Sequence, residues 1–200
     1  MQKALVFDAD PRVDFEEEPV NESDLCLDEP NEYIFVIDRS GSMYQSIILA
    51  RQALKLFLYS LPVGSKFNII SYGSSFDSLF PESVEYTEET LSEAVDQVLQ
   101  FTANYGGTDI LNPLKSAFDK VKTAKLDAHI YLLTDGAVQN NREIINLVEK
   151  RCSPKVRLHT FGVGHGADEH LIKGCALAGN GSYFFVYEND QIEEKVIEAL

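Results

Sequence analysis

Three oxygen-bearing side chains stand at alternate positions directly after an apolar run of the sequence. Asp38, Ser40 and Ser42 lie in the stretch IDRSGSM, which follows YIFV. Residues of these types can form a turn that caps a helix, supply a serine nucleophile, act as a phosphatase-type aspartate, or bind a hard metal ion. Their spacing alone does not distinguish these four kinds of chemistry.

Two further oxygen donors occur later in the chain. Thr108 follows Gly106 and Gly107 in NYGGTD, and Asp135 ends the apolar run of AHIYLLTDG. The set contains no histidine and no cysteine, and sets made only of oxygen donors suit Mg²⁺, Mn²⁺ or Ca²⁺. A shared position of these residues in the folded chain would therefore favour the metal-binding interpretation.

Strand-like and helix-like patterns alternate through most of the sequence, joined by short links. Apolar runs predict strands at 33–37, 66–73, 84–86, 128–136, 156–164 and 182–188. Apolar residues at helical spacing predict helices at 44–61, 88–101, 110–122, 141–152, 168–179 and 190–200. This alternation predicts an α/β fold with a doubly wound, mainly parallel sheet and helices on both faces.

Such a sheet would bring the oxygen donors together. Ligands of doubly wound sheets bind beyond the carboxyl ends of the strands, where the strand order reverses. Asp38 follows one predicted strand, Asp135 ends another, and Thr108 lies in a glycine-rich loop before a predicted helix. We therefore expect all of these donors at one edge of the sheet.

The DRSGS run that begins at Asp38, followed by Thr108 and Asp135, resembles the metal-ion-dependent adhesion site of von Willebrand factor A domains. That site has the pattern DxSxS, a distant threonine and a distant aspartate. The segments SLPVGSKFNIISYGSSFDSLFPESVEYT, GGTDILNPL and FGVGHGADEHLIKGCALAGNGSYFFV are similar to a subgroup that follows a VIT domain. This subgroup occurs in inter-alpha-trypsin inhibitor heavy chains, von Willebrand factor A domain-containing protein 5 and the vault poly(ADP-ribose) polymerase.

The resemblance covers nearly the whole chain, from about Lys3 to Leu200. It implies a six-strand, doubly wound, Rossmann-like domain that holds one Mg²⁺, or Mn²⁺ or Ca²⁺, at its top. It also implies neutral hydroxyl ligands at Ser40, Ser42 and Thr108, and aspartates at Asp38 and Asp135 that act directly or through water. The implied function is a non-enzymatic module whose partner protein offers a carboxylate to the metal.

Charge limits the partners that this chain can have. The sequence has 32 acidic and 17 basic residues, for a formal net charge of −15. Such a surface repels the phosphates of nucleic acids and anionic membranes, so we expect neither as a partner. No apolar run of the sequence approaches the length of about 18 residues that a membrane-spanning helix needs.

Cysteine use gives a mild indication of the compartment. The three cysteines, Cys26, Cys152 and Cys175, are odd in number and form no CxxC motif. They predict neither a disulfide framework nor a zinc site and favour a reducing compartment. We therefore expect a cytoplasmic location, with secretion as the alternative.

The first part of the chain differs from the rest. In residues 1–32 a short strand-like run, KALVF, precedes an acidic stretch interrupted by prolines, which predicts an extended connector. Residues 33–200 are expected to form the A domain itself. The resemblance to multidomain proteins also implies that the chain is a fragment of a larger protein.

Two other functional hypotheses remain. The run ALVFDADPRV resembles the start of haloacid-dehalogenase-type phosphotransferases, which would make Asp8 the nucleophile of a Mg²⁺-dependent phosphohydrolase. Against it, Arg12 departs from that motif, and no downstream lysine and paired-aspartate motif follows. The third hypothesis is a structural domain with a vestigial metal site.

Several residues near the expected site have open roles. A serine nucleophile is disfavoured because the chain has no GxSxG elbow. Asp109 either tunes the site or caps the following helix, and Asp168 is expected to cap the helix that follows it. Arg39 and Met43, on either side of the serines, are not explained by the metal chemistry.

Overall fold

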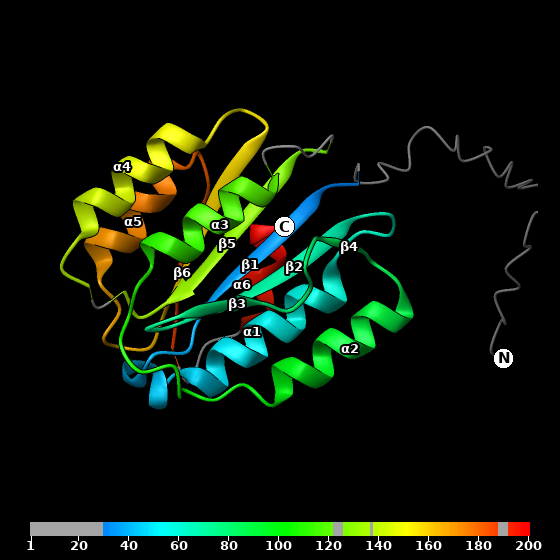
Figure 1. The fold of residues 1–200 in the computed structure, drawn as a ribbon, viewed down its shortest axis with the longest axis horizontal. Coiled ribbons are helices and arrows are strands. Elements are labelled where there is room, and N and C mark those ends of the chain that lie inside the picture. The colour runs from blue at the N-terminus through cyan, green and yellow to red at the C-terminus, as the bar shows by residue number, and fades with distance from the viewer. Residues whose placement is uncertain (1–29, 122–125, 137, 188–191) are drawn as a thin grey trace, which may run out of the picture.

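A sheet six strands wide runs through the middle of the computed structural model, which describes residues 30–121, 126–136 and 138–187, and 192–200 (Figure 1). The strand order is β3-β2-β1-β5-β6-β7. Five of these strands are parallel to one another: β1 (Glu32–Asp38), β2 (Lys66–Tyr72), β5 (Ala128–Thr134), β6 (Val156–Val163) and β7 (Tyr183–Val186). The predicted mainly parallel, six-strand sheet is confirmed.

Two short antiparallel strands share the outer edge of β2. Strand β3 (Phe76–Ser78) pairs with residues 70–72 of β2, and β4 (Val84–Glu85) pairs with residues 66–67. Between β3 and β4, the buried side chain of Asn68 makes the hydrogen bonds that a strand would otherwise make. Its amide accepts from Phe80 N at 3.2 Å and donates to Phe80 O at 2.9 Å. The sequence pattern predicted β4 but not β3.

Helices cover both faces of the sheet (Figure 1). The first face carries α1 (Ile47–Ser60), α2 (Glu88–Leu99) and α6 (Ile192–Ala199), whose buried residues form one hydrophobic core with the sheet. The second face carries α3 (Leu111–Val121), α4 (Asn141–Arg151) and α5 (Glu169–Ala178), which pack on a second core. These helices lie within one to three residues of their predicted positions wherever the structure describes their ends.

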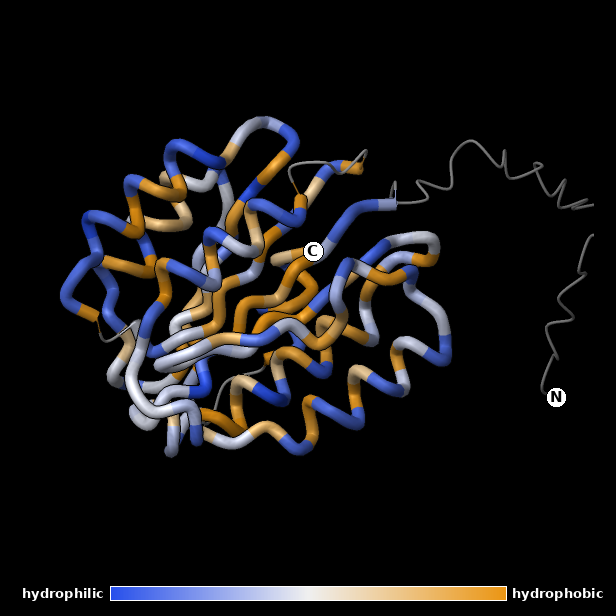
Figure 2. The backbone as a smooth tube through the Cα atoms, viewed as in Figure 1, coloured by the Kyte–Doolittle hydropathy of each residue, from blue (hydrophilic) through white to orange (hydrophobic). Residues whose placement is uncertain are grey.

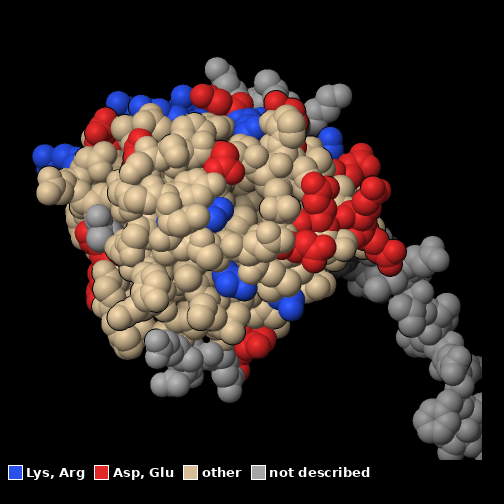
Figure 3. All heavy atoms as spheres, turned by 60° about the horizontal axis from the view of Figure 1, so that its bottom comes forward, with Lys and Arg blue, Asp and Glu red and all other residues tan. Residues whose placement is uncertain are grey.

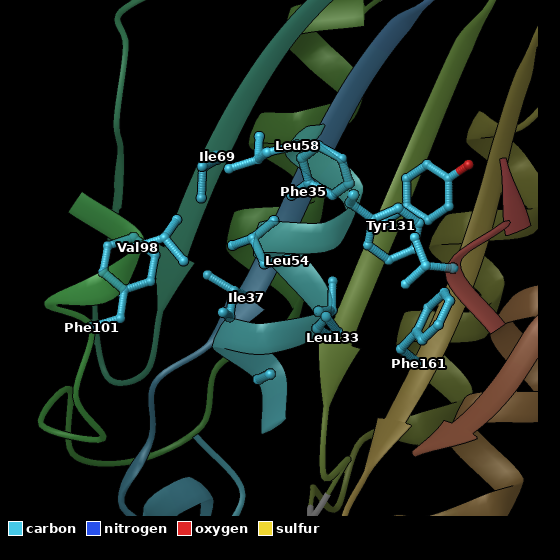
Figure 4. Packing of buried hydrophobic residues seen from close by; sticks show 14 of the residues in the cluster. Phe35, Ile37, Leu54, Leu58, Ile69, Val98, Phe101, Tyr131, Leu133 and Phe161 are labelled. Carbon is cyan, nitrogen blue, oxygen red and sulfur yellow. The ribbon is translucent and has the colours of Figure 1, made fainter. Parts of the chain in front are cut away.

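The central strands are apolar on both sides because each side meets a layer of helices. In β1, Phe35 and Ile37 point to the first core, whereas Ile34 and Val36 point to the second. Figure 4 shows the first core, in which Phe35 and Tyr131 pack beside Leu54 and Leu58 of α1. Figure 2 shows the same arrangement as a hydrophobic sheet between helices that alternate in hydropathy.

The N-terminal assignments lie mostly outside the described residues. The KALVF run, the acidic connector up to Glu29 and the hypothetical nucleophile Asp8 are not described. Strand β1 begins at Glu32, one residue before the predicted strand. None of the described helices combines the length and apolar character that crossing a bilayer requires.

A pair of histidines lies on the neighbouring strands β5 and β6. His129 Nδ1 and His159 Nε2 are 3.1 Å apart, and the His159 ring stacks on Tyr131 with centroids 4.8 Å apart. Because Ser182 N donates to His159 Nδ1 at 3.1 Å, the proton of neutral His159 lies on Nε2. Burial, together with the smaller effect of the positive charges of His129 and Arg157, lowers the pKa of His159 to about 4.

This histidine makes stability depend on pH. Between pH 6.5 and about 4 the unfolded chain binds a proton at His159 that the folded chain excludes, so the free energy of unfolding falls as the pH falls. We expect a loss of about 2 to 3 kcal/mol across this window from His159. Chemical denaturation at several pH values should show a shallower loss for His159→Gln than for the wild type.

His170→Gln makes the same substitution at an exposed position and provides the control for the loss of an imidazole as such. An unchanged pH profile in His159→Gln would contradict the role of the buried ring.

Candidate metal centre

The candidate site lies where β1, β2 and β5 end side by side. Asp38, the last residue of β1, is in register with Tyr72 of β2, and the preceding pair is Ile37 with Leu133 of β5. Thr134, the last residue of β5, therefore lies beside Asp38 on the other side. Parallel pairing brings three polar strand ends to one place at the carboxyl edge of the sheet.

Asp38 is a wholly buried carboxylate with several hydrogen-bond donors. Its Oδ1 accepts from Ser40 N at 2.8 Å, and its Oδ2 accepts from Thr134 Oγ1 at 2.6 Å and from Tyr72 OH at 3.2 Å. Burial raises the pKa of this carboxyl, hydrogen bonds from Ser40 and Thr134 oppose the rise, and the charge of Asp135 adds to it. Among the described residues, no lysine, arginine or histidine pairs with Asp38.

The two serines of the motif face each other. Ser40 has an extended backbone, and a 3₁₀ helix, η2 (Gly41–Tyr44), follows it directly. The resulting turn places Ser40 Oγ and Ser42 Oγ 3.0 Å apart. Ser40 is wholly buried and Ser42 is exposed, so this hydroxyl pair spans the boundary between the protein and the solvent.

The loop that carries Thr108 crosses the ends of β1 and β2. Gly41 N donates to Gly106 O at 2.8 Å, Asp109 N donates to Gly73 O at 2.8 Å, and Ser74 N donates to Tyr105 O at 2.7 Å. These backbone bonds hold the loop that carries Thr108 against Gly41 and the end of β2. In the described part of the chain, no hydrogen bond joins the Thr108 hydroxyl to another residue.

Two glycines make the close approach of this loop possible. A Cβ on Gly73 would lie 2.3 Å from Tyr105 Cβ and 2.6 Å from Tyr105 O, closer than any contact that atoms tolerate. Gly106 has a φ of +77°, in the left-handed region that side chains other than glycine rarely adopt.

Arg39, unexplained by metal chemistry, anchors the same loop. Its guanidinium lies 4.4 Å from the ring centroid of Phe101 and 4.3 Å from that of Tyr105. It also donates to Thr102 O at 3.0 Å and to Asn104 Oδ1 at 3.0 Å. Arg39 is thus a positioning residue that holds the start of the Thr108 loop against β1.

Two other open roles are answered by the structure. Met43 is fully buried in the first hydrophobic core, so its role is packing. Asp109 caps α3, because its Oδ1 accepts from Leu111 N at 3.1 Å and from Asn112 N at 3.4 Å. Asp168 caps α5 as expected, by accepting from the amides of His170 and Leu171.

Asp135 borders the site on the side of β5. Its side chain is nearly buried, and its main-chain oxygen accepts from Asp168 N at 2.8 Å. Asp135 and Ser42 line a common hollow of about 180 Å³ with Ser46 of the loop before α1 and His165 of the loop after β6. The hollow gives the solvent side of the site a defined shape.

Hydrogen bonds therefore link Asp38 to Ser40 and Ser40 to Ser42, Asp135 lines the same hollow as Ser42, and the loop that carries Thr108 is held by its backbone.

Tyr72 was not predicted from the sequence, because only the strand register brings it to Asp38. The described residues contain no group of three or more His, Cys, Asp or Glu side chains suited to a metal. A site made of two carboxylates and three hydroxyls fits a hard cation by its oxygen donors alone.

Comparisons with known proteins match the whole described domain. A family model for the von Willebrand factor type A domain matches residues 31–185. Von Willebrand factor A domain-containing protein 5A of Rattus norvegicus is 39% identical over 194 residues, covering 90% of this chain and 23% of that protein. Protein 5B1 of Homo sapiens is 36% identical over 170 residues, covering 84% of this chain and 14% of that protein.

Solved structures share the fold at lower identity. A von Willebrand factor type A protein from Catenulispora acidiphila has a TM-score of 0.73 and 22% identity, over 84% of this chain and 41% of that one. Manganese-loaded TRAP of Plasmodium vivax has a TM-score of 0.62 and 21% identity, over 84% and 71%. Proximal thread matrix protein 1 of the mussel byssus, with a zinc-occupied MIDAS motif, has a TM-score of 0.63 and 16% identity, over 84% and 45%.

The contact between Gly73 and the Thr108 loop can be tested directly. Gly73→Ala should force Tyr105 away and lower the free energy of unfolding by about 2 kcal/mol, as other overpacked positions do. Hydrogen exchange of residues 104–109 should become faster, because the added methyl group pushes this loop away from the end of β2.

Gly166→Ala is the matched control, since a Cβ there would meet nothing within 4 Å. Equal stability of both variants would show that the loop does not depend on the close approach at Gly73.

Proposed function

Because the chain belongs to the von Willebrand factor type A domain family, we propose that it is a non-enzymatic protein-binding module that recognises its partner through a divalent cation. The proposed ligands are Asp38, Ser40, Ser42, Thr108 and Asp135. Mg²⁺ is the proposed ion, with Mn²⁺ or Ca²⁺ as substitutes, because all of the donors are oxygens.

The observation that carries this proposal is the buried carboxylate of Asp38 beside the paired hydroxyls of Ser40 and Ser42. A carboxylate removed from water is costly unless hydrogen bonds or a cation compensate it. Tyr72 and Thr134 supply hydrogen bonds, and no cationic side chain of the described residues supplies a charge. A divalent cation would compensate the charge of Asp38.

Each residue of the set has a distinct part in the proposal. A bound divalent cation supplies an electrophilic centre that attracts an anionic ligand. The neutral hydroxyls of Ser40, Ser42 and Thr108 leave most of that charge available to a carboxylate from the partner. Ser42 is the exposed member of the set, so the partner would approach from its side.

The surface around Ser42 suits a protein partner with apolar residues near its carboxylate. Tyr44 is 79% exposed and Ile48 is 60% exposed, and both lie within two turns of Ser42. Large apolar side chains stabilise a complex when the partner covers them and removes them from water. A carboxylate alone would leave this surface uncovered.

Charge argues against nucleic acid as the partner. Figure 3 shows acidic side chains gathered at one end of the face that it presents, and Glu85, Glu88 and Glu89 are exposed where β4 leads into α2. A surface of this sign repels phosphates.

We also retain the expectation of a reducing, cytoplasmic compartment, since Cys152 and Cys175 are free thiols.

The chain spans 23% and 14% of the two relatives described above, so we propose that it works as one domain of a larger protein. In that setting the module would bring its partner to the other domains, and its own residues would carry no catalysis.

Metal titration tests the proposal. Calorimetry with Mg²⁺ and Mn²⁺ should show binding to the wild type, and affinity about 10- to 100-fold weaker in Asp38→Asn and in Ser42→Ala. Asp38→Asn keeps the shape of the side chain, which limits the effect on folding, and circular dichroism should confirm this.

Asp96→Asn is the control, because Asp96 is an exposed carboxylate of α2 outside the proposed ligand set. Equal affinity in all four proteins would place the metal elsewhere. Absence of binding by the folded wild type would instead favour a vestigial site.

A further inference from the structure

One oxygen of the Asp38 carboxylate is fully occupied by hydroxyl groups of the protein itself. Asp38 Oδ2 accepts from Thr134 Oγ1 at 2.6 Å and from Tyr72 OH at 3.2 Å. A carboxylate oxygen has two lone pairs, so two hydroxyl donors satisfy it. All three side chains are wholly buried, which keeps water from replacing either donor.

The hydroxyl of Thr134 has a fixed orientation toward Asp38. An ionised carboxylate only accepts hydrogen bonds, so the single proton of this hydroxyl lies toward Oδ2. The acceptor side of Thr134 Oγ1 is used by Gly136 N, which donates to it at 2.8 Å. The backbone turn after β5 therefore holds this donor in place, and Tyr72 of β2 approaches the same oxygen from the other neighbouring strand.

The other oxygen of Asp38 lies on the side of the serines. Oδ1 accepts from Ser40 N at 2.8 Å, and Ser40 Oγ lies 3.0 Å from the hydroxyl of the exposed Ser42. Asp38 can therefore offer Oδ1 to a cation, directly or through a water molecule. It cannot offer Oδ2 as long as both hydroxyl donors are present.

Hard cations differ in how much this restriction costs them. Ca²⁺ takes about six to eight oxygen ligands and often binds both oxygens of one carboxylate. Mg²⁺ takes about six ligands in nearly ideal octahedral geometry and usually keeps several waters. An aspartate that is limited to one oxygen therefore withholds a ligand that Ca²⁺ would use and that Mg²⁺ does not need.

We propose that Tyr72 and Thr134 determine the specificity of the candidate metal centre, and that they favour Mg²⁺ over Ca²⁺ by occupying Oδ2 of Asp38. The assignment rests on the proposed function, since it concerns which ion the same site holds. Neither residue belongs to the proposed ligand set. Both act through Asp38 and are therefore positioning residues.

Separate calorimetric titrations of the full chain with Mg²⁺ and with Ca²⁺ test this assignment. The wild type should bind Mg²⁺ more tightly than Ca²⁺. Tyr72→Phe and Thr134→Val each remove one hydroxyl and free a lone pair of Oδ2. The ratio of the Ca²⁺ Kd to the Mg²⁺ Kd should therefore fall by about tenfold in each variant.

The ratio separates this role from a merely structural one. General damage to the site would weaken the binding of both ions and leave the ratio unchanged. Thr134→Ser keeps the hydroxyl and should keep the wild-type ratio. Because Tyr72→Phe and Thr134→Val are made separately, loss of folding in one, detected by circular dichroism, leaves the test to the other.

Two buried hydroxyls elsewhere in the domain provide matched controls. Tyr131→Phe removes a phenol hydroxyl that donates to Ala199 O, in the core shown in Figure 4. Thr160→Val removes a hydroxyl that donates to Ile172 O. Neither hydroxyl is bonded to Asp38, so both variants should keep the wild-type ratio.

The outcomes distinguish this assignment from the proposed function. An unchanged ratio in the folded Tyr72→Phe and Thr134→Val proteins, or tighter binding of Ca²⁺ than of Mg²⁺ by the wild type, would overturn the assignment and leave the proposed function standing. A wild type that binds neither ion would overturn the proposed function and the assignment with it.

Discussion

A single carboxylate, excluded from water, organises the carboxyl edge of this domain. Asp38 is wholly buried and accepts hydrogen bonds from the backbone of its own loop, from β2 and from β5. Burial of an ionised group in a protein interior is unfavourable unless its surroundings compensate it, so each of these donors has to be in place. The strand register supplies Tyr72 and Thr134, and the turn after β1 supplies Ser40.

The loops above the sheet depend on backbone contacts as much as on side chains. Gly73 and Gly106 let the Thr108 loop approach the end of β2 closely, and main-chain hydrogen bonds join this loop to Gly41, Gly73 and Ser74. The guanidinium of Arg39 packs against the rings of Phe101 and Tyr105 and so fixes the start of the Thr108 loop. Local rigidity of this kind lets hydroxyl groups from distant parts of the sequence act as one set.

The order of strands and helices was predictable because each element has a strong local pattern. The same holds for Asp38, Ser40 and Ser42, whose spacing is visible in the sequence, whereas their assignment to a metal rested on a family resemblance. Tyr72 and Arg39 were not predictable, because their partners lie more than 30 residues away and only the folded register brings them together. Strand β3 was missed for a similar reason: its three residues are polar or exposed and form a strand only by pairing with β2.

The outer edge of β2 has a consequence for self-association. An unpaired strand edge is a template for the addition of strands from other chains, and proteins protect such edges with short or interrupted strands. Here β3 and β4 cover the two halves of the edge, and the amide of Asn68 closes the interval between them. Growth of the sheet into an intermolecular ribbon is thereby blocked on this side. Growth remains possible only at the opposite edge of the described sheet, which is β7. This strand is only four residues long and therefore offers little length for pairing.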